Sequence, residues 1–174
     1  MRRFDRADGA PLHYASAHAL WNPTAAREAD TRTWASYAGI VALRRQLSGG
    51  DVPADAAELF RRMAFNVIVG NTDDHGRNHG FLMNAQGHWR LAPAFDVLPS
   101  FRSEVHALGV GPAGAARDLD NVLAGAANFG LNQAQARTVL KELGKRVVRR
   151  YSKLLDEARC APADRDIVLG RVLA

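Results

Sequence analysis

The sequence holds a single cysteine, Cys160, and no long apolar run. One cysteine cannot form a disulfide within the chain, so a reducing compartment such as the cytoplasm is expected. No stretch reaches the roughly 18 consecutive apolar residues that a membrane span needs. The opening segment "MRRFDRADGA" is positively charged but has no apolar run behind it, unlike a secretory signal. The sequence therefore predicts a cytoplasmic protein without membrane contact.

Lysine is scarce as well, because none occurs before Lys141 and arginine supplies most of the positive charge. The net charge is +5 and the isoelectric point is about 10.0. This balance favours anionic partners such as nucleic acid, nucleotide phosphates or acidic proteins, but it selects none of them. The length of 174 residues, with 47% apolar and 24% charged residues, fits one globular domain with its own core. We find no repeats, low-complexity segments or linkers, so residues 1–174 are taken as a single domain.

Hydrophobic periodicity predicts a mainly α fold with one or two small β-hairpins. Apolar residues recur at helical spacing, and cap residues bound the segments. Extended segments flank a turn at residues 8–9, and a hairpin is centred on residues 84–87. Residues 93–116 are rich in glycine and proline and are expected to form loops. The predicted helices cover residues 31–47, 53–69, 118–127, 132–158 and 163–173.

The loop "GNTDDHGRNHGFL", at residues 70–82, concentrates acidic, amide and basic side chains after an apolar helix. Asp73 and Asn78 are five residues apart, and Asp96 follows the predicted hairpin. A hairpin returns the chain to where it began, so Asp96 is expected beside Asn78. A carboxylate and an amide oxygen there form the kind of hard-ligand site that Mg²⁺ takes when phosphate oxygens complete its shell. Asp73, slightly apart, could accept a proton from an attacking hydroxyl.

Two further side chains of the loop, His75 and Arg77, could bind phosphate oxygens. The Asp-x4-Asn interval, followed by a hairpin and another aspartate, is the arrangement that protein kinases use for phosphoryl transfer. The sequence thus favours a kinase site with ATP and Mg²⁺ as cofactors.

Each of these residues also has a structural interpretation. Asp73 or Asp74 can cap a turn, since "NTDD" is turn chemistry, and this is the expected role of Asp74. His79 is expected to be an ordinary half-buried histidine. Arg77 can serve as the counter-charge to the aspartates, and Asp96 can form an Asx turn before Pro99. The kinase interpretation is preferred because it explains all of these residues together.

At these residues the chain resembles the HipA family of serine/threonine kinases, which pair with a DNA-binding antitoxin. The resemblance rests on "RRFDR", "HYASA", "NVIVGNTDDHGRNHGFLM" and "WRLAPAFDVLPS", which together span about residues 2–100. The helical tail resembles the C-terminal region of that family more loosely. The resemblance implies a protein-kinase-like C-terminal lobe.

The resemblance also implies roles for individual residues. Asp73 would be the catalytic aspartate, and Asn78 and Asp96 would hold Mg²⁺. His75 and Arg77 would lie along the ATP phosphates, although the family more often has lysine in place of Arg77. The guanidinium of arginine is planar and has several N–H donors, whereas the ammonium of lysine is a compact charge, so the contacts with phosphate would differ. The "RFDR" stretch would adjoin the hinge, which would bring Arg3 and Phe4 near adenine.

The front of the chain departs from the family pattern. No glycine-rich loop and no strand lysine precede the hinge segment, so the sequence resembles the C-terminal lobe alone. We expect an N-terminal lobe to come from elsewhere, and the chain alone to bind ATP weakly. In this family the protein substrates include translation factors and aminoacyl-tRNA synthetases, and the partner would be a HipB-like antitoxin.

Two rival functions remain open. The first is a non-catalytic remnant that binds an antitoxin or another partner through its helices. The second is a metal-dependent phosphodiesterase or nuclease that uses Asp73, His75, Asn78 and His79. The predicted helix at residues 132–158 also carries a basic face, which could touch DNA phosphates weakly or be a solvated outer surface.

Overall fold

The computed structural model of the protein describes residues 4–7, 9–21, 35–100 and 103–173. Helices and two small sheets make up this part of the chain, and no helix in it is both long enough and apolar enough to cross a membrane. The elements in chain order are β1 (Arg6–Ala7), β2 (Ala10–Pro11), β3 (His13–Ser16), α1 (Ala17–Leu20), α4 (Tyr37–Gln46), α5 (Val52–Val69), β4 (Gly80–Met83), β5 (Trp89–Leu91), α6 (Leu119–Ala124), the 3-10 helix η1 (Ala126–Phe129), α7 (Gln133–Glu157) and α8 (Pro162–Leu173).

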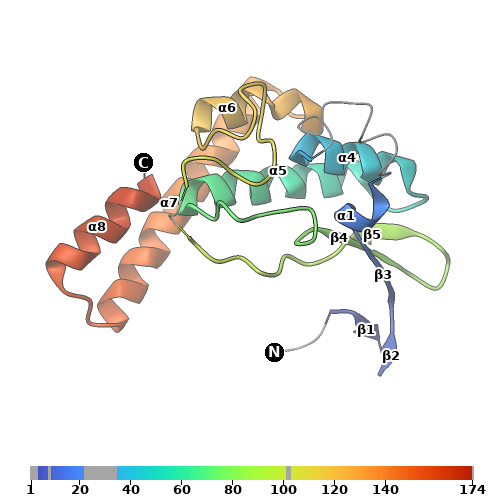
Figure 1. Ribbon diagram of the computed structural model, residues 1–174, viewed down its shortest axis with the longest axis horizontal. Helices are drawn as coiled ribbons and strands as arrows, with labels where there is room; N and C mark the ends of the chain where they lie inside the picture. The colour runs from blue at the N-terminus through green and yellow to red at the C-terminus, as the bar shows by residue number, and fades with distance from the viewer. Residues whose placement is uncertain (1–3, 8, 22–34, 101–102, 174) are drawn as a thin grey trace.

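Helix α5 is the centre of the fold and ends at the candidate site. Figure 1 shows α5 running across the middle, with α7 and α8 at one end and the three-stranded sheet at the other. It packs against α4, α6, η1, α7 and α8. One side of α5 carries apolar side chains at helical spacing that are fully or almost fully buried, as predicted. They include Leu59, Phe60, Met63, Ala64 and Val67.

Helix α4 begins later than the sequence suggested. Ser36 is its N-cap, and the side-chain oxygen of Ser36 accepts a hydrogen bond from the amide of Gly39 at 2.9 Å. Ala35 and Ser36, which periodicity had included in the helix, therefore precede it. The start predicted at residue 31 lies outside the described residues. A serine that caps a helix satisfies an otherwise free amide, so the cap outweighs the apolar pattern.

The C-terminal helices follow the prediction closely. Asn132 caps α7, and its side chain and that of Gln135 form a reciprocal capping box. Helix α8 begins one residue before the predicted start. The segment predicted as one helix at residues 118–127 is instead divided at Gly125 into α6 and η1.

The strands form two small antiparallel sheets. The predicted hairpin is present as β4 and β5, and Asn84 closes its turn by accepting hydrogen bonds from the amides of Gln86 and His88. Strand β3 adds to the other edge of β4, which makes a sheet of order β3-β4-β5. Gly80 permits this pairing, because a Cβ there would lie 2.3 Å from the ring of Tyr14. The pairing between β3 and β4 was not predicted from the sequence.

Candidate active site

One polar cleft lies where the loop after α5 meets the segment after β5. It has a volume of about 230 Å³ and brings Asp73, Asn78 and Asp96 together. These are the three residues whose convergence the sequence predicted. The rest of the cleft is lined by Asn71, Leu98, Pro99 and Ser100.

Backbone geometry brings these distant segments together. Helix α5 ends at Gly70, whose left-handed conformation (φ 70°) turns the chain sharply. The amide of Ser100 donates to the carbonyl of Gly70 at 3.0 Å, and the amide of Ala92 donates to the carbonyl of Gly80 at 2.8 Å. The segment that carries Asp96 is therefore held along the loop that carries Asn78.

The two cleft carboxylates are available to a ligand. The side chains of Asp73 and Asp96 are exposed, and none of the described residues donates a hydrogen bond to either carboxylate. The Asx turn considered for Asp96 is thus absent from the described contacts. Asp96 also has φ 55°, a left-handed conformation that is costly for a residue other than glycine. Strain of this kind is common at functional sites.

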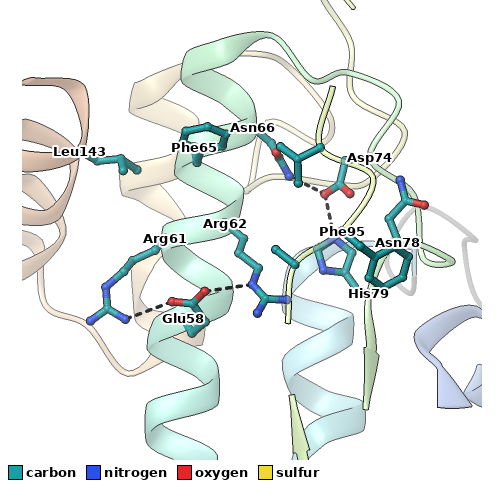
Figure 2. Close-up of a pocket in the computed structure, with 12 residues that line it drawn as sticks. Glu58, Arg61, Arg62, Phe65, Asn66, Asp74, Asn78, His79, Phe95 and Leu143 are labelled. Carbon is teal, nitrogen blue, oxygen red and sulfur yellow. Dashed lines mark hydrogen bonds and ion pairs between the residues drawn. The ribbon is translucent and has the colours of Figure 1, made fainter. Parts of the chain in front are cut away.

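The neighbouring aspartate, Asp74, has the opposite environment. It is 3% exposed, and its Oδ2 atom accepts hydrogen bonds from three side chains. The hydroxyl of Tyr37 in α4 is one donor, the amide of Asn66 in α5 donates at 2.8 Å, and Nε2 of His79 lies at 2.8 Å. Figure 2 shows Asn66 and His79 converging on this carboxylate from two directions. The structural role predicted for Asp74 is present, but through a buried network rather than a turn cap.

The pKa values of this network follow from burial and hydrogen bonding. Burial by itself raises the pKa of Asp74, but the hydrogen bond and charge of His79, together with the hydrogen bonds from Tyr37 and Asn66, outweigh it and hold that pKa below 3.8. Burial, followed by the charge of Asp74, holds the pKa of Tyr37 well above 10.0. Asp74 is therefore an ionised acceptor, and Tyr37 is a neutral donor.

His79 is more deeply buried than the sequence suggested, at 2% exposed. Its Nε2 atom contacts Asp74, while its Nδ1 atom is buried without a hydrogen-bond partner. The Nε2 atom is therefore the side of the ring that contacts the loop, through the carboxylate of Asp74. His79 does not line the cleft of Asp73 and Asp96 but a second pocket that shares Asn78.

The other predicted nucleotide-binding residues lie around the cleft rather than in its lining. His75 is half-buried, and Arg77 is exposed with its guanidinium 3.4 Å from Nε2 of His18. Arg77 forms no ion pair with an aspartate of the described chain, so it is not their counter-charge. The ring of Phe4 stacks on Phe95, the residue before Asp96, with 5.5 Å between ring centroids. Arg3 lies outside the described residues.

The donor set fits Mg²⁺ bound together with phosphate. Asn78 and Asp96 offer oxygen atoms, which suit a hard cation, and Asp73 adds negative charge to the same cleft. No cluster of three or more histidine, cysteine, aspartate or glutamate side chains suited to a metal occurs in the described ranges. Two protein oxygen ligands leave most of the six positions of Mg²⁺ to water and phosphate, as is usual for this ion.

Comparison with known proteins identifies the family. The model of the HipA-like C-terminal domain matches residues 1–151. The chain belongs to this family. A curated Haemophilus influenzae protein named "Putative kinase" is 33% identical to this HipA-like chain over 70 residues, which cover 40% of the chain and 20% of that protein.

The fold agrees with the family. A solved structure of the Shewanella oneidensis MR-1 toxin–antitoxin system, with HipA, HipB and operator DNA, matches with a TM-score of 0.71. The match covers 98% of this HipA-like chain and 46% of the solved chain, at 16% identity. The mainly α, kinase-like C-terminal lobe predicted from the sequence is thereby confirmed. The chain spans about half of the solved protein and one fifth of the curated relative.

Proposed function

We propose that this domain is the catalytic half of a HipA-like serine/threonine kinase, which transfers the γ-phosphoryl group of ATP to a hydroxyl of a protein substrate. The observation that carries the proposal is the convergence of Asp73, Asn78 and Asp96 on one cleft. Family membership supports it, because the match to the family at residues 1–151 includes all three residues.

The chemistry assigned to the cleft is in-line phosphoryl transfer. Asn78 and Asp96 would hold Mg²⁺, which neutralises charge on the phosphate oxygens when it is bound. The substrate hydroxyl oxygen forms a bond to the γ-phosphorus, and the bond from that phosphorus to the bridging oxygen of ADP breaks. Asp73 accepts the proton of the hydroxyl, since its carboxylate is exposed and has no hydrogen-bond donor in the described chain.

The residues around the cleft would bind the rest of the nucleotide. His75 and Arg77 follow Asp73 on the same loop and would contact phosphate oxygens. Phe4 and Arg3 would lie near adenine, and the stacking of Phe4 on Phe95 supports a link between that segment and the metal site. An N-terminal lobe would close the nucleotide cleft and exclude water.

The test first measures the binding of ATP and then the phosphorylation of protein. Calorimetry with ATP and Mg²⁺ should give weak binding to this chain and tighter binding when an N-terminal lobe is supplied. Phosphorylation of protein should then appear and be abolished by Asp73→Asn, while Mg²⁺-dependent binding is retained. Asp96→Asn should lose the Mg²⁺ dependence itself. Absence of phosphorylation with the complete nucleotide site would favour a non-catalytic domain that binds a partner.

A HipB-like DNA-binding antitoxin is the proposed partner, with DNA contact limited to weak phosphate interactions. The solved relative is a complex of HipA with HipB and operator DNA. In this chain the solvent-facing side of α7 carries exposed basic residues four positions apart, which places them on one helix face. Binding to a DNA duplex should weaken steeply with added salt, and persistence of binding at high salt would contradict phosphate contact. The basic row consists of Arg137, Lys141, Lys145, Arg149 and Lys153.

A further inference from the structure

Two buried polar side chains, Asp74 and His79, fix the loop that carries the proposed active site to the protein core. Asp74 follows Asp73 directly, and His79 follows Asn78 directly. Adjacent Cα atoms are about 3.8 Å apart, so a shift of either anchor displaces its neighbour in the cleft. Asp74 and His79 contact each other at 2.8 Å, which ties the two anchors together across the loop.

The anchors are fixed to the helical scaffold and not only to each other. Tyr37 of α4 and Asn66 of α5 both donate to Asp74, and the Nδ2 atom of Asn66 also lies 3.0 Å from the Tyr37 hydroxyl. The Oδ1 atom of Asn66 accepts from Nδ2 of Asn71 at 3.2 Å, and Asn71 itself lines the cleft. A continuous chain of hydrogen bonds therefore runs from α4 through α5 to the wall of the cleft.

We propose that Asp74 and His79 are positioning residues, which hold Asp73 and Asn78 at the geometry that binds Mg²⁺ with nucleotide phosphate. This inference rests on the proposed kinase function. Neither anchor lines the cleft of Asp73 and Asp96, although both line a second pocket that shares Asn78, so their influence on that cleft runs through their neighbours in the chain. Buried groups that orient metal ligands typically change metal affinity by about 10–100-fold when they are removed.

The geometry also indicates which substitution of His79 should preserve its hydrogen bond to Asp74. Only the Nε2 side of His79 has a partner, and that partner is a carboxylate, so the ring serves as a single hydrogen-bond donor. Glutamine can present a terminal N–H at a similar distance from the backbone, whereas leucine fills the space without a donor. His79→Gln and His79→Leu therefore form a matched pair. Val147→Ala is the stability control, since Val147 is buried in a separate cluster beside α8.

The experiment measures the metal site and the loop separately. Mn²⁺ with ATP serves as the probe, and paramagnetic broadening of the backbone amide signals of Asp73 and Asn78 reports the affinity. We expect His79→Leu and Asp74→Asn to weaken Mn²⁺ binding at least about tenfold. His79→Gln should stay within a few-fold of the wild type, and Val147→Ala should leave the affinity unchanged. Equal affinities in the wild type, His79→Leu and Asp74→Asn would overturn the inference while leaving the proposed function intact.

Amide hydrogen exchange of the metal-free chain gives a second readout. His79→Leu should lower protection of the Asn78 amide, which donates to the carbonyl of His75 at 2.9 Å, more than Val147→Ala does. Unchanged local protection would also count against the inference. A wild-type chain with no Mn²⁺ effect on Asp73 and Asn78 would instead contradict the proposed metal site, and the positioning role would fall with it.

Discussion

Asp96 has a strained backbone conformation and is also a proposed Mg²⁺ ligand. Substitutions at this position should distinguish the effect of the strain on stability from the effect of the carboxylate on metal binding. Its φ of 55° lies in the left-handed region, which costs most residues about 1–2 kcal/mol relative to the right-handed helix. The carboxylate makes no hydrogen bond with the described residues, so truncation removes no visible contact. The backbone alone should then decide how Asp96→Gly and Asp96→Ala differ in stability.

The expected difference is about 1 kcal/mol in favour of Asp96→Gly. Glycine relieves the left-handed strain, which outweighs part of its extra flexibility in the unfolded chain. For a domain of this length, 1 kcal/mol corresponds to a shift of about 2–4 °C in Tm. Both variants should lose the stabilisation that Mn²⁺ with ATP gives the wild type, which is about 2.7 kcal/mol at 100 times Kd.

Thermal and urea unfolding, each with and without Mn²⁺ and ATP, measure both quantities. Arg159 is the matched control, because its φ is 51° and it follows the C-cap of α7. Arg159→Gly should likewise be more stable than Arg159→Ala, without any loss of the metal effect. Equal stability of Asp96→Gly and Asp96→Ala would refute the strain argument. Retained Mn²⁺ stabilisation in either Asp96 variant would refute its role as a metal ligand.

Three further outcomes follow from buried groups outside the cleft. Arg44 is fully buried, pairs with Asp55 at 2.5 Å and donates hydrogen bonds to three backbone carbonyls. Arg44→Lys should therefore lower the free energy of unfolding, measured with urea, by about 3 kcal/mol. A loss below about 1 kcal/mol would contradict this. In Gly80→Ala the added methyl group would collide with the ring of Tyr14. This single variant should therefore unfold at a lower temperature than the double variant that also carries Tyr14→Ala. The reverse order of Tm values would be inconsistent with that contact. His106 is buried, and burial lowers its pKa from 6.5 to about 4; the charge of Asp74 opposes this shift, and the charge of Arg117 adds to it. As the pH falls from 7 to 5, His106 becomes protonated in the unfolded chain but stays neutral in the folded chain. The free energy of unfolding should therefore decrease by about 2 kcal/mol over this range. Replacing His106 with Asn should flatten that part of the pH profile, and an unchanged slope would exclude His106 as its source.

The elements that the sequence predicted well are those specified by local chemistry. Asn132 caps α7 at the helix start predicted at residue 132, and Asn84 lies in the turn predicted at residues 84–87. The convergence of Asp96 with Asn78 was also predictable, because a short hairpin limits how far the chain can travel. In each case a few neighbouring residues decide the outcome, so one sequence is enough.

The contacts that the sequence did not reveal join residues far apart along the chain. Tyr37 and Asp74 are 37 residues apart, and Arg44 contacts the carbonyl of Trp89 across 45 residues. Tyr37 matched a helical apolar stripe, so periodicity alone assigned it to the core and gave no sign of a polar partner. Arg44 carries a charge, and arginine is seldom fully buried, so its residue type gave no sign of a buried role. A signal was nevertheless present for Asp74, since two adjacent aspartates require different environments if both are to be ionised.

The different environments of these two aspartates explain why the loop tolerates so much charge. The negative charge of Asp74 is stabilised by hydrogen bonds from Tyr37, Asn66 and His79. No described basic side chain is bound to the cleft carboxylates of Asp73 and Asp96. Had an arginine paired with Asp73, the same contact would have competed with Mg²⁺ for the carboxylate. The buried network thus stabilises the loop without using the negative charge of the cleft. That charge stays available to attract a divalent cation, which is the property that the proposed phosphoryl transfer requires.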